Sequence, residues 1–242
     1  MGDSDRVGGA GSMGSRSAYI GGSAVLTGSE KLVNKGKELA ADALEASAAD
    51  IGYEAGRFTI AGTDRGIGLL ALAAERGPIA DQADVDSRVG SYPYGWHVCE
   101  VEVDAETGLA RIDRYTTIDD VGRAVNPLIL HGQTHGGIAQ GAGQALMERC
   151  FYAPDDQLLS GSFMDYAMPR ADDFPAFVTA LSEVPSTNHP LGFRGGGEGG
   201  ITPALGVIIN AVVDALADLG VTHIDMPASP ERVWRAIREA QA

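Results

Sequence analysis

The chain has 242 residues, of which 33 are acidic and 18 are basic, so its formal net charge is −15. A chain this acidic is a poor partner for nucleic acid or for an anionic membrane surface, and it lacks the apolar stretch of about 18 residues that a transmembrane helix needs. The two cysteines, Cys99 and Cys150, form no C-x-x-C motif, which favours a reducing, cytoplasmic location over a disulfide framework.

The sequence of the first part of the chain predicts a loop, a helix and a hairpin, followed by a short helix and a connecting segment. These elements fall at residues 1–16, 17–48, 50–64, 66–77 and 78–93. Apolar side chains at three- and four-residue spacing indicate the long helix, in which Gly28 and Gly36 allow a break. Alternation of apolar and polar residues around Gly56 indicates the hairpin.

The remainder predicts a second hairpin, a helix, a strand and two further helices. They fall at residues 97–122, 127–147, 176–183, 203–219 and from Pro230 onward. Ser229 is expected to cap the last helix. Because short strands and helices mix without strict βαβ alternation, the sequence predicts an α+β fold, a layered mixed α/β domain with short sheets and packed helices.

Three glycine-rich segments hold the candidate chemistry: GGAGSMGSRS (8–17), GQTHGGIAQGAGQAL (132–146) and GFRGGGEGG (192–200). The first precedes the long predicted helix. Backbone N–H groups at a helix start, with Arg16 beside them, can hold a phosphate. The same pattern is also typical of a flexible end with an ordinary serine cap.

The second segment contains an amide side chain and two histidines. Gln133 is placed to hydrogen-bond a polar ligand. His131 and His135 are four residues apart, as in some metal sites, but no third ligand of the right kind is near. They are therefore expected to be ordinary polar or buried histidines.

The third segment contains one carboxylate, Glu198. A carboxylate in a close-packed glycine loop before a helix can act as a general base, with a pKa raised by burial. An exposed loop glutamate is the commoner case, and this motif alone does not decide between them. Elsewhere, Asp119, Asp120 and Glu183 are expected to be strand-end or surface acids, and Cys99 is expected in the core.

Taken in order, these segments resemble the C-terminal, molybdopterin-binding portion of the large subunit of the molybdenum hydroxylases. This family includes xanthine dehydrogenase, aldehyde oxidoreductase and carbon monoxide dehydrogenase. The resemblance covers nearly the whole chain, from GDSDRVGGAGSMGSRS through VEVDAETGLARIDRYTTIDDVGRAVNPLILHGQTHGG to GFRGGGEGGITPAL. It implies that residues 1–242 form the second molybdenum-cofactor-binding domain, without the N-terminal part of such a subunit.

The resemblance also implies roles for single residues. The residues that would hold the pterin and its phosphate are Gly14, Ser15, Arg16 and Ser17. Gln133 would contact the cofactor near the metal, and Gly197 would lie against the cofactor. Glu198 would sit beside the molybdenum and act as the base that activates a metal-bound hydroxyl for attack on a carbon centre.

The implied cofactor is molybdopterin, in its cytosine dinucleotide form, with iron–sulfur clusters and FAD on partner subunits. The expected function is the C-terminal half of a split molybdenum hydroxylase large subunit. It would oxidise an aldehyde, an N-heterocycle or a similar small substrate with water as the oxygen source, and only together with the chain that supplies the N-terminal half. Two alternatives stay open: an inactive remnant or non-catalytic assembly module, and a nucleotide-phosphate-binding domain built on residues 8–17.

Overall fold

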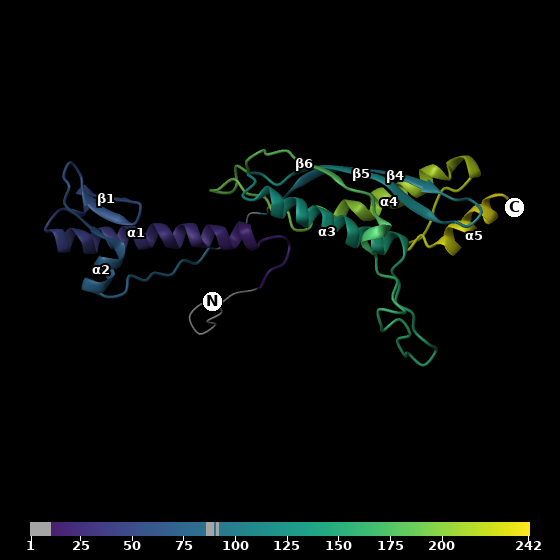
Figure 1. The fold of residues 1–242 in the computed structure, drawn as a ribbon, viewed down its shortest axis with the longest axis horizontal. Coiled ribbons are helices and arrows are strands. Elements are labelled where there is room, and N and C mark those ends of the chain that lie inside the picture. Colours follow the sequence, from purple (N-terminus) through teal and green to yellow (C-terminus); the bar gives the residue numbers. More distant parts are fainter. Residues whose placement is uncertain (1–10, 86–89, 91) are drawn as a thin grey trace. The chain divides into compact units, whose positions relative to one another are not determined.

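The computed structural model describes residues 11–85, 90 and 92–242, and the chain divides into two compact units (Figure 1). One unit is Ser17–Gly90. The other combines Met1–Arg16 with Ser91–Ala242, so two distant parts of the sequence build it together. Among the described residues, every helix is too short or too polar to cross a membrane.

The Ser17–Gly90 unit is a long helix packed on a small sheet. Its elements are η1 (Ser17–Gly21), α1 (Gly22–Leu44), η2 (Ala48–Asp50), β1 (Ile51–Glu54), β2 (Arg57–Ile60), β3 (Gly66–Gly68) and α2 (Leu69–Arg76). The three strands are antiparallel and lie in sequence order. The predicted hairpin is therefore confirmed, with its turn at Gly56.

Two predicted boundaries in this unit were wrong. The long helix continues through Gly36, where the ring of Phe58 packs in the space that a side chain would fill. It ends at Leu44 because Glu45 adopts the left-handed conformation, with φ 50°. Residues 66–68 are a strand, not the start of a helix, since they pair with Arg57–Thr59.

The second unit is a three-stranded sheet covered by helices. Its regular elements are β4 (Tyr94–Val103), β5 (Ala110–Asp120), α3 (Pro127–Leu146), η3 (Ala171–Asp173), β6 (Val178–Leu181), α4 (Ile201–Ala215), η4 (Ala217–Leu219) and α5 (Pro230–Ala240). β4 and β5 are antiparallel, whereas β6 adds to β5 in parallel. α3 packs along α4, and α4 packs on β4 (Figure 1). The α+β prediction is thus confirmed.

The core of this unit fills the space between the sheet and α4. Ile138 of α3, Ile208 and Val212 of α4 and Val233 of α5 are fully buried. Pro230 occupies the first position of α5, as predicted. The side chain of Ser229 makes no capping hydrogen bond; its backbone carbonyl oxygen accepts from the N–H of Val233 instead.

Candidate functional site

Glycines let the loop before α4 touch the backbone of α3. A Cβ on Gly137 would lie 2.7 Å from the backbone nitrogen of Ile201, and one on Gly200 would collide with the carbonyl oxygen of Thr134. Further along, a Cβ on Gly141 would lie 2.6 Å from the Cβ of Ala204. Because no side chain intervenes, the loop and the helix approach backbone to backbone, which fixes where Glu198 emerges.

The same loop packs against the stretch that precedes η1. A Cβ on Gly195 would lie 2.5 Å from the carbonyl oxygen of Ser15. Ser15 itself adopts the left-handed conformation, with φ 56°, and its Oγ donates a hydrogen bond of 3.0 Å to Oε2 of Glu198. The first and third glycine-rich segments therefore meet, although 183 residues separate the two side chains.

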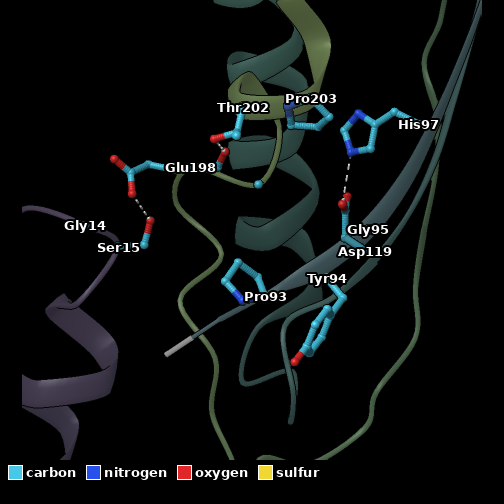
Figure 2. Close-up of a pocket in the computed structure, with 11 residues that line it drawn as sticks. Gly14, Ser15, Pro93, Tyr94, Gly95, His97, Asp119, Glu198, Thr202 and Pro203 are labelled. Carbon is cyan, nitrogen blue, oxygen red and sulfur yellow. Dashed lines mark hydrogen bonds and ion pairs between the residues drawn. The ribbon is translucent and has the colours of Figure 1, made fainter. Parts of the chain in front are cut away.

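A cavity of about 380 Å³ opens beside Glu198 (Figure 2). Its polar and glycine lining comes from five segments, namely Gly14 and Ser15, Gly95 and His97 of β4, Asp119 of β5, Glu198 and Gly199 before α4, and Thr202 of α4. A volume of this size is in the range of small-molecule and cofactor sites. The Glu198 side chain is exposed within this chain, so the burial expected for a buried base is not supplied by the described residues.

A buried polar network forms the wall that β4 and β5 contribute. His97 lies 2.9 Å from the hydroxyl of Tyr115 through Nδ1 and 3.1 Å from Oδ1 of Asp119 through Nε2. Burial, together with the charges of Cys99 and Asp119, raises the pKa of Tyr115, so Tyr115 stays a neutral hydroxyl. Sequence reasoning did not single out His97 or Tyr115.

Both acids at the end of β5 are buried. The expected strand-end position is confirmed, but the surface position was wrong for Asp119 and Asp120, which are 4% and 8% exposed. Asp120 accepts hydrogen bonds from the N–H groups of Gly122 and Val184, and lies 3.7 Å from the guanidinium of Arg194. These partners replace the water that a buried carboxylate loses.

The predicted phosphate loop is only partly in the site. Gly14 and Ser15 line the cavity. The guanidinium of Arg16 donates to the carbonyl oxygen of Gly11 at 3.1 Å. Ser17 begins η1 in the other unit. Neither Arg16 nor Ser17 lines the cavity.

Of the residues singled out in α3, one lies next to Glu198 and two do not. Gln133 is exposed, and its Nε2 lies 3.8 Å from the position that a Cβ on Gly197 would take, so Gln133 and Gly197 are neighbours next to Glu198. His131 and His135 both hydrogen-bond to Oγ1 of Thr179, at 2.8 and 3.2 Å. In the described part of the chain, no three or more His, Cys, Asp or Glu side chains gather as they would around a metal ion.

The two cysteines should differ sharply in reactivity. Burial, and secondarily the charge of Glu100, raises the pKa of Cys99 to about 12, so its thiolate is scarce at pH 8. Cys150 is exposed. We expect iodoacetamide at pH 8 to label Cys150 and to spare Cys99, as measured by peptide mass spectrometry. Equal labelling of both in the native chain would contradict this, and labelling in urea provides the control.

Comparison with known proteins identifies the family. Residues 1–175 match the family model of the molybdopterin cofactor-binding domain, and the chain belongs to this family. It corresponds to a molybdopterin-binding portion of the large subunit of a molybdenum hydroxylase. The resemblance noted in the sequence is thereby confirmed.

Several relatives match nearly the whole chain. The carbon monoxide dehydrogenase large chain of Hydrogenophaga pseudoflava is 32% identical over 241 residues, which are 96% of this chain and 30% of that protein. The 6-hydroxypseudooxynicotine dehydrogenase complex subunit gamma of Paenarthrobacter nicotinovorans is 38% identical over 93% of this chain and 30% of its own length. The crystal structure of quinoline 2-oxidoreductase from Pseudomonas putida 86 matches with a TM-score of 0.83 and 33% identity, over 96% of this chain and 31% of that one. The chain thus spans about 30% of the length of these relatives.

The cavity fits a bulky cofactor. Gly14, Gly95 and Gly199 line the cavity without side chains that would fill it, and Gln133, a neighbour of Gly197, offers an amide donor next to Glu198. A pterin bears ring nitrogens and a phosphate that such donors and loop N–H groups can bind. The residues present are therefore compatible with the cofactor that defines the family.

Proposed function

We propose that the chain is the cofactor-binding C-terminal half of a split molybdenum hydroxylase large subunit. It acts on an aldehyde, an N-heterocycle or a similar small substrate, with water as the oxygen source. The observation that carries this proposal is the contact between Ser15 and Glu198 at the edge of one cavity, because it joins two segments to which the family resemblance gives cofactor and catalytic roles. Relatives named for quinoline and for a pseudooxynicotine derivative act on small molecules of this kind.

In this proposal Gly14, Ser15 and Arg16 hold the pterin and its phosphate, and Gln133 and Gly197 contact the cofactor near its metal. When bound, the molybdenum cofactor supplies the two-electron redox chemistry. Glu198 accepts the proton that the attacking hydroxyl releases. The hydrogen bond from Ser15 occupies Oε2 and thereby leaves Oε1 of Glu198 to take that proton.

The proposal includes partners and a specific cofactor form. The cofactor is the cytosine dinucleotide, the electrons leave through iron–sulfur clusters and FAD on other subunits in the cytoplasm, and a further chain supplies the N-terminal half of the large subunit. Exposed apolar side chains in the loop that joins α3 to β6 support the proposal of a partner chain. Phe163 and Met164 are 83% and 93% exposed, and Leu159 is 56% exposed. Apolar groups exposed together in this way are typical of protein contact surfaces.

The test is the metal content of the assembled complex. The chain is co-expressed with its N-terminal partner chain, and molybdenum and released cytidine monophosphate are quantified in the purified complex. We expect stoichiometric amounts of both. A complex that assembles without molybdenum would contradict the proposal and favour an assembly module. Nucleotide binding by the isolated chain without any molybdenum would favour a phosphate-binding domain built on residues 8–17.

A glycine substitution sharpens this test. We expect Gly195→Ala to lower the molybdenum content, because its Cβ would lie 2.5 Å from the carbonyl oxygen of Ser15 and would push the phosphate loop away. Gly206→Ala is the matched control, since a Cβ there meets nothing within 4 Å. Equal molybdenum content in the two variants would show that the position of Ser15 does not matter for loading.

A further inference from the structure

The two carboxylate oxygens of Asp119 differ in how many hydrogen bonds they accept from the described residues. Its Oδ2 accepts from the hydroxyls of Thr117 and Thr134, at 2.9 and 3.3 Å. Among the described residues, its Oδ1 has one partner, Nε2 of His97, at 3.1 Å. Because a carboxylate only accepts, Nε2 of His97 carries a proton and donates it to Oδ1. All three hydrogen bonds between Asp119 and these side chains therefore run toward its carboxylate, and Oδ1 keeps a second acceptor site.

A glycine leaves that site uncovered. Gly95 of β4 and Asp119 of β5 are directly paired in the sheet, so a side chain at position 95 would lie beside the carboxylate. A Cβ there would be 2.5 Å from Oδ1. Both residues line the cavity that Glu198 also lines (Figure 2). The side chain of Asp119 is nevertheless only 6% exposed, so little water can reach it.

The cavity around this oxygen suits a flat ring. Pro93 and Tyr94 at the start of β4, and Pro203 of α4, contribute apolar and ring surfaces to its lining. A weakly hydrated carboxylate oxygen gains most from a ligand that donates a hydrogen bond, and a ligand without a donor leaves it unpaired. An N–H on an aromatic heterocycle combines both properties. An aldehyde or another molecule without a hydrogen-bond donor would leave Oδ1 of Asp119 without this partner.

We propose that Oδ1 of Asp119, opened to the cavity by Gly95, binds an N–H group of a heterocycle. That heterocycle is either the pterin of the cofactor or an N-heterocyclic substrate. The identity of the occupant rests on the proposed function, whereas the donor requirement rests on the geometry alone. His97 and Tyr115 act as positioning residues, because they hold the carboxylate with Oδ1 toward the cavity.

The first test compares two pteridines on the isolated full-length chain. Pterin carries N–H donors at N3 and at its 2-amino group. In 1,3-dimethyllumazine, N1 and N3 are methylated and an oxo group replaces the amino group, so that no N–H donor is left. We expect calorimetry to show pterin binding about tenfold more tightly or better, as expected for a hydrogen bond to a charged acceptor. Equal affinity for the two, or no binding of pterin, would overturn the proposal. Neither measurement requires turnover or molybdenum, so its failure is distinct from failure of the proposed function.

Variants separate ligand binding from a purely structural role of the network. Gly95→Ala keeps every member of the network but places a Cβ 2.5 Å from Oδ1, so the carboxylate oxygen has to shift from its position. It should lower the affinity for pterin about tenfold while leaving that for 1,3-dimethyllumazine unchanged. Gly52→Ala in β1 is the control, because its Cβ would make only ordinary contacts, 3.6 Å or more away. If Gly95→Ala keeps the full preference for pterin, the acceptor role is wrong. Asp119→Ala, which removes both carboxylate oxygens, with an unchanged preference would overturn it as well.

The loaded complex distinguishes the two sources of the N–H group. If the cofactor supplies it, Gly95→Ala should reduce the molybdenum and pterin content. If the substrate supplies it, the content should stay constant while KM for an N–H heterocycle rises and kcat is retained. A variant with unchanged content and unchanged KM would overturn the proposal.

Discussion

Glu198→Gln should lower the turnover of the molybdenum-loaded complex about 10²- to 10⁴-fold, the usual contribution of a positioned general base. Glutamine keeps the size of the side chain, and its amide oxygen can still accept the hydrogen bond from Ser15. It cannot take up a proton at neutral pH. We therefore expect the molybdenum content to stay unchanged while kcat falls, as measured by dye reduction and metal analysis on the same preparation.

A second glutamate provides the matched control. Glu100 lies on the exposed side of β4 and pairs with Arg114 at 3.4 Å, away from the cavity. Glu100→Gln should leave both kcat and the molybdenum content unchanged. If Glu198→Gln retained full turnover, Glu198 would not be the base. If it lost molybdenum together with activity, its role would lie in holding the cofactor.

Gly137→Ala should destabilise the unit that contains β4, β5 and β6 by about 1–3 kcal/mol, the range observed for overpacked positions. A Cβ there would lie 2.7 Å from the nitrogen of Ile201 and 2.9 Å from the Cα of Gly200. These are backbone atoms, so no side chain can rotate aside. The contact between α3 and the loop that carries Glu198 has to widen, and we expect loading of the complex to suffer with stability.

Gly136, the neighbouring residue, provides the matched control for Gly137→Ala. A Cβ on Gly136 meets nothing within 4 Å, so Gly136→Ala should be neutral or stabilising by up to about 1 kcal/mol through helix propensity. The measurement is urea unfolding followed by tryptophan fluorescence. Both tryptophans of the chain, Trp96 and Trp234, belong to this unit, so the signal reports it alone. Equal stability of the two variants would contradict the close packing.

Periodicity predicted most of the fold. It identified the long N-terminal helix and both hairpins, because each has a one-sided apolar pattern. It missed β3, since the residues 66–68, with a single apolar side chain between two glycines, carry no strand alternation. The parallel pairing of β6 with β5 also could not be predicted, because the register of two strands so distant in sequence depends on packing between them.

The site was predictable where a motif marked it. Ser15 and Glu198 were singled out from their glycine-rich surroundings, and the structure brings them into contact. The network of His97 and Asp119 was missed, although a signal existed. His97 shares the inward side of its strand with Cys99 and Val101, and a polar residue at such a position needs a buried partner. What the sequence could not show is which residue of β5 supplies that partner.

The two walls of the cavity differ in how firmly the chain holds them. Glu198 emerges next to α4, whose Ile208 and Val212 are fully buried, whereas residues 11–16 include no buried side chain. A single hydrogen bond such as that of Ser15 contributes only about 0.5–1.5 kcal/mol, so local unfolding should release the Ser15 wall long before the core opens. A ligand that binds both walls suppresses this opening by mass action. Occupancy of the cavity and local order in residues 11–16 are therefore thermodynamically linked.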